Sequence, residues 1–370
     1  MAFPGSWREM ETPASLVDVD RVEANLRKTV DYCRTWNLAW RPHAKTHKSA
    51  ALAREQLRRG AQGLTVATRR EAEVMAQASD DLLLAYPFYG PVALDYILKL
   101  PENTRITLSL DSAEALRHLA AHSMARGRSL GVLVEIDLGL HRVGVSTIDQ
   151  ALTLATKAAE TEGVDYRGIL FYPGHVRMPA EAQEPALKAL SLRLDGTIRA
   201  LADAGLRPEI VSGGSTPTLF RSHEIAGLTE IRSGTTLFND RTTALLGACE
   251  WSDCAYSVLA TVVSTSLPGQ VVVDAGSKAL AKEEVNGVFD DPSLSAGFGC
   301  VMDRPELRVT KLSEEHGIID LSASDWRPEL GDVVRIVPNH VCVSVNLTRR
   351  LWQVQGERVL GSCEVEARRG

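Results

Sequence analysis

The sequence lacks an excess of basic charge, a long apolar run and a cationic leader. The 370-residue chain carries 41 Lys and Arg against 47 Asp and Glu, its formal net charge is -6, and its pI is about 5.9. This balance argues against a nucleic-acid partner, because phosphate binding requires a basic excess. The longest apolar runs, such as 82–85, fall far short of the roughly 20 residues of a membrane span. Residues 1–13 show no cationic start followed by an apolar core, so we expect no membrane partner and no secretory signal.

The chain is also poor in cysteine, and its cysteines follow no framework. Their wide spacing matches no disulfide pattern, and they are Cys33, Cys249, Cys254, Cys300, Cys342 and Cys363. Scattered cysteines are typical of proteins in a reducing compartment. We therefore expect a cytoplasmic protein without disulfides.

Short apolar strands alternate with helical segments from about residue 20 to 248. The eight strand candidates are 38–44, 64–67, 82–85, 106–111, 131–137, 168–172, 210–214 and 230–234, and helical stretches such as 50–59, 69–77, 113–125 and 180–204 lie between them. Such alternation predicts a parallel sheet buried on both faces, and eight units fit a (β/α)8 TIM barrel. A doubly wound sheet usually carries a glycine-rich fingerprint after its first strand. Here that position reads RPHAKTHKS, without glycine.

The pattern changes after about residue 249. Runs at 256–266, 270–276, 307–313, 333–338, 351–355 and 358–365 are β-rich and are separated by turn signals such as Pro268-Gly269. We predict an all-β domain over 249–370, which residues 1–19 can join because 13–20 is also strand-like.

The predicted strand ends gather chemically useful side chains, and the active sites of such barrels lie at the carboxyl ends of the strands. The first strand leads into His43 and Lys45, and the fifth into Arg142. The last two end in the glycine- and hydroxyl-rich runs 212–218 and 233–240. A lysine at one side and a phosphate-binding turn at the other suggest pyridoxal phosphate. The alternatives are a solvated lysine, ordinary turns, and an arginine paired with Asp137 or Glu135.

Longer motifs carry a family resemblance. RPHAKTHKS at 41–49, LTVATRREAEVM at 64–75, LLLAYP at 82–87 and PNHVCVSVNL at 338–347 resemble the fold-type III pyridoxal-phosphate enzymes related to alanine racemase. The D-serine dehydratase and D-threonine aldolase branch is the closer match. The similarity covers nearly the whole chain, including 12–26, 131–146, 272–280 and 313–317.

The resemblance implies roles for the strand-end residues. Lys45 would form the Schiff base with the cofactor, and Lys48 would be structural. His43, two residues before Lys45 and on the same side of a strand, would flank the cofactor. Arg142 would lie near the phenolic oxygen and Tyr172 near the pyridine ring. The expected phosphate-binding residues are Gly214, Ser215, Thr216, Ser233, Gly234 and Thr235.

The HVC run at 340–342 is a candidate metal pair. On a strand, His340 and Cys342 would point to the same face, and imidazole plus thiolate suits zinc, with manganese as the other candidate. In the family this site lies in the β domain, close to the β-hydroxyl of the substrate. Two protein ligands leave open positions, so the metal can act as a Lewis acid.

The resemblance favours a lyase that acts on D-β-hydroxy amino acids. Dehydratases of D-serine or D-threo-3-hydroxyaspartate, which release an α-keto acid and ammonia, tend to have H-x-C at this site, as here. Enzymes that cleave D-threonine to glycine and an aldehyde tend to have H-x-D, and this retro-aldol reaction is the alternative. A non-catalytic carrier of pyridoxal phosphate is a distant one.

Three further expectations concern the racemase reaction, the substrate carboxylate and assembly. A racemase commonly needs a tyrosine from the β domain, and residues 257–370 contain none. The candidate partners of the substrate carboxylate are Arg177, His175 and Arg241. By analogy with the family, we expect a homodimer.

Overall fold

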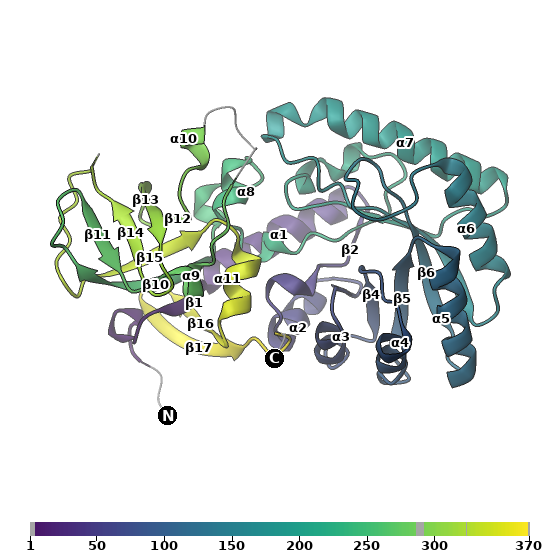
Figure 1. Ribbon diagram of the computed structural model, residues 1–370, viewed down its shortest axis with the longest axis horizontal. Coiled ribbons are helices and arrows are strands. Elements are labelled where there is room, and N and C mark those ends of the chain that lie inside the picture. Colours follow the sequence, from purple (N-terminus) through teal and green to yellow (C-terminus); the bar gives the residue numbers. More distant parts are fainter. Residues whose placement is uncertain (1–3, 286–291, 323, 369–370) are drawn as a thin grey trace. The chain divides into compact units, whose positions relative to one another are not determined.

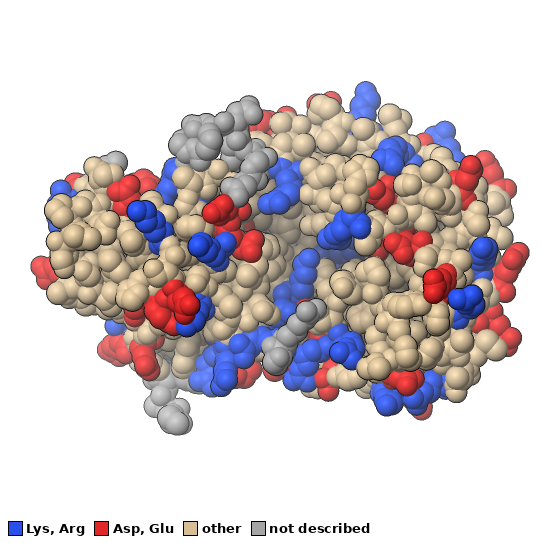
Figure 2. Space-filling model, viewed as in Figure 1, with Lys and Arg blue, Asp and Glu red and all other residues tan. Residues whose placement is uncertain are grey.

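The computed structural model describes residues 4–285, 292–322 and 324–368, and these residues form two compact units. Of these residues, the barrel unit comprises 29–234 with 367–368, and the β unit comprises 4–28 with the described residues from 235 to 366. Among the described residues, no helix combines the length and the apolar character needed to cross a membrane. On the face shown in Figure 2, acidic and basic side chains are interspersed, as the near balance of charges predicts.

The barrel unit contains eight parallel strands in the order β2-β9-β8-β7-β6-β5-β4-β3. A bridge between His43 and Thr65 joins the two ends of this order. The prediction of a (β/α)8 barrel is confirmed. The strands are β2 (Ala39–Trp40), β3 (Leu64–Val66), β4 (Asp81–Leu84), β5 (Arg105–Leu110), β6 (Leu130–Glu135), β7 (Val164–Leu170), β8 (Ile210–Gly213) and β9 (Glu230–Ile231).

Helices cover the outer face of these strands (Figure 1). Their ends follow local sequence signals: Thr68 and Ser112 each cap the start of a helix through their side chains, and Gly127 ends the helix that Ser112 begins, in the left-handed conformation. The helices of the barrel unit are α2 (Ala50–Arg58), α3 (Arg69–Met75), α4 (Pro91–Leu98), α5 (Ala113–Arg126), α6 (Ile148–Glu160) and α7 (Glu184–Asp203), and α1 (Val19–Thr35) precedes them in the chain.

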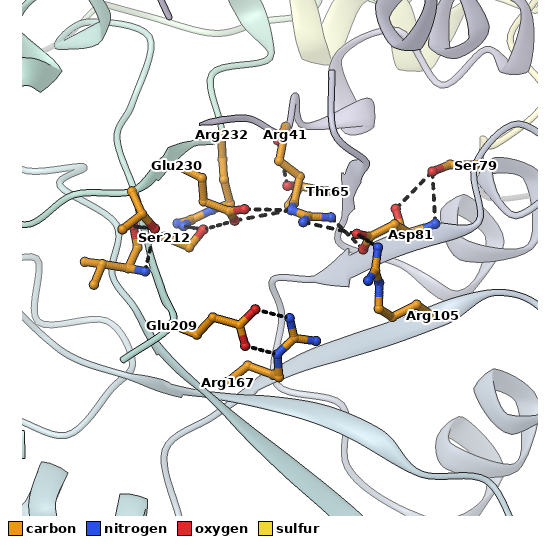
Figure 3. Close-up of polar contacts among 12 residues, drawn as sticks. Arg41, Thr65, Ser79, Asp81, Arg105, Arg167, Glu209, Ser212, Glu230 and Arg232 are labelled. Carbon is orange, nitrogen blue, oxygen red and sulfur yellow. Dashed lines mark hydrogen bonds and ion pairs between the residues drawn. The ribbon is translucent and has the colours of Figure 1, made fainter. Parts of the chain in front are cut away.

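The inside of the barrel is apolar in the middle and charged at the amino ends of the strands. Leu83, Leu133 and Leu170 form an apolar cluster of fully buried side chains. At the amino ends, the guanidinium of Arg41 lies between two buried carboxylates, 2.7 Å from Asp81 and 3.0 Å from Glu230 (Figure 3). A cavity of about 300 Å³ lies beside them. Since its charged groups pair with one another, we assign this end to stability.

The β unit is built on a nine-stranded sheet in the order β11-β14-β13-β12-β15-β10-β1-β16-β17. The strands are β1 (Ala14–Asp18), β10 (Tyr256–Ser264), β11 (Gln270–Val273), β12 (Gly299–Val301), β13 (Arg304–Leu312), β14 (Gly317–Asp320), β15 (Val333–Pro338), β16 (Arg350–Gln355) and β17 (Arg358–Glu364). Strand β1 pairs antiparallel with β10 and parallel with β16. Its Leu16 packs with Trp7, Leu259 and Val354 in an apolar cluster.

The predicted strands of this unit are present, but two strands and the helices are additional. Strands β12 and β14 were not predicted. The short helices of this unit are α8 (Arg241–Leu245), α9 (Ser277–Leu280), α10 (Pro292–Ser295) and α11 (Val341–Leu347).

Short 3-10 turns occur in both units. They are η1 (Trp7–Glu9), η5 (Thr235–Leu237) and η6 (Trp251–Asp253) in the β unit, and η2 (Ala44–Thr46), η3 (Ala180–Ala182) and η4 (Leu219–Glu224) in the barrel unit.

Candidate active site

The two lysines of the segment after β2 lie in different environments. Lys45 is exposed, whereas all the other residues from 41 to 50 are buried. Within the described residues, its side chain has no hydrogen-bond or ion-pair partner. Lys48 is buried, and its Nζ lies 2.7 Å from Oε1 of the buried Glu71. Of the two lysines, only Lys45 has an amine that is free to react.

The prediction that His43 and Lys45 share one side of a strand is wrong. The strand ends at Trp40, and Lys45 lies in the 3-10 turn η2, whose N-cap is His43. The chain turns because the ring Nδ1 of His43 accepts a hydrogen bond from the backbone N–H of Lys45 at 3.4 Å. Burial, followed by the nearby charges of Lys45 and Arg232, holds the pKa of His43 well below its ordinary value. His43 is therefore neutral at pH 7 and supports the turn that carries Lys45.

The loops after β6 and β7 bring Arg142 and Tyr172 together. The guanidinium carbon of Arg142 lies 5.1 Å from the centre of the Tyr172 ring, a cation–π contact. Asp137 does not pair with Arg142. Its carboxylate accepts from the backbone N–H groups of Gly139 and His141 and lies 2.8 Å from the His141 ring. The arginine therefore remains available to a ligand.

The turns after β8 and β9 form a buried, small-residue cup. Gly214 has a φ of +81°, and the hydroxyl of Ser233 donates to the backbone oxygen of Ser215 at 3.2 Å. A Cβ on Gly234 would lie 2.4 Å from the backbone oxygen of His43, so only glycine allows this approach to the lysine turn. Within the described residues, no hydrogen bond is made by the backbone N–H groups of Gly214, Ser215 and Gly234. Such free donors are what a phosphate requires.

Sequence reasoning missed Arg232, which lies between the strand β9 and this cup. Its guanidinium is buried and donates to the Ser212 hydroxyl and to the backbone oxygen of Phe171, both at 2.7 Å. Burial lowers its pKa to about 10, so it stays protonated and fixes the ends of β7 and β8. The signal was present in the run EIRSG at 230–234, because the residue two after an inward-pointing Glu230 also points into the barrel.

The candidate metal pair lies in the β unit, but it does not lie on a strand. Strand β15 ends at Pro338, His340 is the N-cap of α11, and Cys342 lies in the first turn of that helix. The prediction of a strand pair is therefore wrong. Partial burial lowers the pKa of His340, but the charge of Cys342 and side-chain hydrogen bonds to Asp240 and Cys342 raise it well above its ordinary value. The hydroxyl of Thr235 lies 3.6 Å from the Cys342 sulfur.

The described residues contain no group of three or more His, Cys, Asp and Glu side chains that could hold a metal ion. A metal bound by His340 and Cys342 would therefore take its other ligands from water or substrate. An imidazole and a thiolate with open positions form the donor set of a catalytic site rather than that of a closed structural one.

The three candidates for the substrate carboxylate differ in their availability. Arg241 is engaged, since its buried guanidinium donates to Asn339 Oδ1 and to the backbone oxygens of Leu294 and Ser295. His175 is half-buried, and its Nδ1 has no hydrogen-bond partner among the described residues. Arg177 is exposed and its side chain makes no hydrogen bond or ion pair within the described part of the chain.

Comparisons with known proteins agree with this geometry. Residues 17–242 match the alanine racemase N-terminal domain, and residues 255–354 match a serine dehydratase domain. D-threo-3-hydroxyaspartate dehydratase of Delftia sp. is 34% identical over 90% of this chain and 92% of its own length. D-threonine aldolase of Arthrobacter sp. is 30% identical over 97% of this chain and 93% of its own length.

Solved structures of D-threo-3-hydroxyaspartate dehydratase variants share the fold. A histidine-to-alanine variant has a TM-score of 0.89 at 29% identity and covers 97% of this chain and 96% of its own. A cysteine-to-alanine variant, described as the metal-free form, has a TM-score of 0.87 at 30% identity and covers 98% of this chain and 99% of its own. The two substituted positions are two residues apart. On these grounds, the chain belongs to the D-serine dehydratase and D-threonine aldolase family, whose members depend on pyridoxal phosphate and are related to alanine racemase.

Proposed function

We propose that this protein is a pyridoxal-phosphate- and metal-dependent lyase that dehydrates a D-β-hydroxy amino acid, such as D-serine or D-threo-3-hydroxyaspartate, to an α-keto acid and ammonia. The observation that carries the proposal is Lys45, an exposed and unpartnered amine on an otherwise buried turn. A lysine in this position is suited to react through its amine and contributes little to packing.

The barrel unit fits the cofactor. A phosphate needs several converging N–H donors, and the turns at Gly214, Ser215 and Gly234 supply them without a competing partner in the described residues. Lys45 would form the covalent link to the cofactor aldehyde, and His43 would hold the lysine turn in place. Arg142, fixed against the Tyr172 ring, would contact the cofactor ring.

Each chain residue then has a defined task. The amine of Lys45 would serve as the base that takes the α-proton of the substrate. When bound, pyridoxal phosphate withdraws the electron pair left on the α-carbon. The neutral His43 does not compete for the proton that Lys45 receives.

The β unit supplies the group that assists the loss of hydroxide. His340 and Cys342 would hold a divalent cation, and imidazole plus thiolate favours zinc over manganese. When bound, the metal draws electron density from the β-oxygen as a Lewis acid. The relative with variants at a histidine and a cysteine has the same spacing of two residues, and one of these variants is described as metal-free. This agreement supports the assignment of the pair.

The retro-aldol reaction is the second candidate, and the similarity to D-threonine aldolase favours it specifically. Here a base takes the proton of the β-hydroxyl and the Cα–Cβ bond breaks, which gives glycine and an aldehyde. The thiolate ligand Cys342 in place of a carboxylate is our reason to rank dehydration first. The racemase reaction ranks below both, because residues 257–370 contain no tyrosine to act as the second base.

Product analysis tests the proposal directly. The protein is reconstituted with pyridoxal phosphate and Zn²⁺ and incubated with D-serine, D-threonine and D-threo-3-hydroxyaspartate, with and without a chelator. We expect keto acid and ammonia, which the chelator abolishes. Glycine and an aldehyde would establish the aldolase instead, and an unchanged amino acid with bound yellow cofactor would establish the carrier.

A pair of cysteine variants tests the role of the metal ligand. We expect Cys342→Asp to shift the products toward glycine and aldehyde, because a carboxylate ligand alters the acidity of the metal site. The matched control is Cys33→Ala, which removes a buried thiol whose pKa burial raises to about 12; it should leave the product ratio unchanged. An unchanged ratio in the Cys342 variant would refute the argument from the ligand type.

Assembly and location complete the proposal. We infer a homodimer in the cytoplasm, on the basis of the family and of the six cysteines, none of which forms a disulfide within the described residues. Light scattering on the eluted protein measures the assembly, and a monomeric mass with full activity would refute the dimer.

For the substrate carboxylate we propose Arg177, since the guanidinium of Arg241 is already engaged.

A further inference from the structure

A buried carboxylate beside the metal pair has no role in the proposed reaction. Asp240, at the N-cap of α8, is completely buried in the β unit. Its Oδ2 lies 3.0 Å from Nδ1 of His340 and accepts from the backbone N–H of Val341 at 3.1 Å. Its Oδ1 accepts from the backbone N–H and the hydroxyl of Thr243, at 2.8 and 3.0 Å.

The two carboxylate oxygens of Asp240 bind different partners. Capping the helix requires one acceptor, and Oδ1 fulfils this need through Thr243. Oδ2 is not needed for the cap, and it faces His340 instead. Helix capping alone would be satisfied by Asn, Ser or Thr, so the second carboxylate oxygen points to a separate function.

The contact gives the two ring nitrogens different partners. An ionised carboxylate can only accept hydrogen bonds, so the Nδ1–H group of His340 is the donor to Asp240. The lone pair for a metal would then come from Nε2, and the binding cation would displace any proton there. The backbone N–H of Val341 binds the same oxygen and fixes the carboxylate in this orientation.

We propose that Asp240 is the positioning residue of the metal site, which holds His340 as its Nδ1–H tautomer and presents Nε2 to the divalent cation. This inference rests on the proposed function for the identity of the metal pair. It deepens that function by adding a residue that neither touches the substrate nor binds the metal. Carboxylates that orient metal-bound histidines commonly strengthen metal binding about 10–100-fold.

Metal affinity, measured with Zn²⁺ against a chromophoric chelator, tests the proposal. In Asp240→Asn, one oxygen can still cap α8, but the amide N–H₂ group now faces the imidazole and Val341. We expect Zn²⁺ affinity to fall about 10–100-fold. The control Thr243→Val removes the hydroxyl from the cap and leaves the carboxylate against His340, so its affinity should stay within about threefold of the wild type. Equal affinities in wild type and Asp240→Asn would overturn the proposal.

A measurement on the wild type covers the case in which Asp240→Asn does not fold. Nitrogen NMR of ¹⁵N-histidine-labelled protein, with the His340 signal assigned from His340→Gln, reports which ring nitrogen carries a proton and which binds Zn²⁺. We expect a protonated Nδ1 and a Zn²⁺-bound Nε2. Zn²⁺ at Nδ1, or an unprotonated Nδ1, would overturn the proposal, because helix capping alone does not fix the tautomer.

The outcome for Asp240 is separate from the outcome for the proposed function. If Zn²⁺ binds with the expected tautomer but no keto acid or glycine forms, the proposed lyase fails and the role of Asp240 stands. If products form while the tautomer or the affinity contradicts the expectation, the role of Asp240 fails alone. If neither His340→Gln nor Cys342→Ala alters Zn²⁺ binding, the metal pair is refuted, and the role of Asp240 with it.

Discussion

The contrast between Lys45 and Lys48 predicts that two neighbouring lysines have opposite effects when they are replaced. Lys45→Ala removes an exposed side chain without a partner in the described residues, so the free energy of unfolding should change by less than about 0.5 kcal/mol. The same variant should lose the visible absorbance of the bound cofactor and its covalent trapping by borohydride. The loss is expected because Lys45 carries the only free amine of the pair.

Lys48→Met should do the reverse. It leaves Glu71, which is 1% exposed, with a buried charge and one remaining bond, from the backbone N–H of Ala67 at 2.7 Å. Removing one partner of a buried ion pair costs about 3–5 kcal/mol, and the remaining bond places the cost near 3 kcal/mol. Cofactor trapping on protein that remains folded should be unaffected.

Guanidinium titration of the cofactor-free protein measures the free energy of unfolding. Mass spectrometry of the borohydride-treated protein identifies the lysine at which the cofactor is trapped. The matched control for Lys48→Met is Arg70→Met, which breaks a half-exposed ion pair with Glu73 and should cost less than about 1 kcal/mol. Trapping at Lys48, or a cost for Lys48→Met no larger than that of the control, would refute the reasoning.

Three further predictions concern the stability of the barrel, the metal and the pH dependence. Arg41→Met leaves two buried carboxylates without their shared partner and should lower the free energy of unfolding by about 3–5 kcal/mol. Arg105→Met breaks an ion pair whose arginine is largely exposed and should lower it by less than about 1 kcal/mol; similar losses for the two variants in guanidinium titration would contradict this. A chelator should abolish turnover and leave the absorbance of the cofactor unchanged, and Zn²⁺ should restore turnover. The reason is that the proposed metal ligands His340 and Cys342 belong to the β unit, whereas Lys45, the proposed site of the covalent link, belongs to the barrel unit. Burial lowers the pKa of His47 to about 4. The contribution of His47 to the free energy of unfolding is therefore complete above the unfolded pKa of about 6.5 and falls by about 3 kcal/mol as the pH drops toward 4. In His47→Asn the free energy of unfolding should fall less steeply over this pH range, and an unchanged slope would refute the assignment.

The barrel was predictable because its strands are short, continuous and apolar. Leu82, Leu83 and Leu84 are all buried, and such a run is typical of a strand covered on both faces. The cup was predictable for a related reason, since Gly214 and Gly234 lie where the backbone must turn or approach closely.

The local geometry around the reactive side chains could not be predicted, because it depends on single hydrogen bonds. The ring of His43 accepts a hydrogen bond from one backbone N–H group, and the chain turns there into η2. The spacing of apolar residues in the sequence does not predict that bond. The metal pair was misplaced for the same reason: Val341 to Leu347 reads as β-branched and strand-like, yet packing buries Val341 and Val345 on one face of a helix. Asp240 was missed because its partner lies 100 residues away in the sequence.

The place of β1 between two other strands of the nine-stranded sheet has a consequence for synthesis on the ribosome. This strand emerges at residues 14–18, but both of its neighbours, β10 and β16, are encoded more than two hundred residues later. At roughly 5–20 residues per second, the nascent chain must keep Leu16 and Val17 unpaired for on the order of ten seconds or more. Two open hydrogen-bonding edges on an apolar segment invite wrong partners, so β1 is the part of the newborn polypeptide where a chaperone would be needed first.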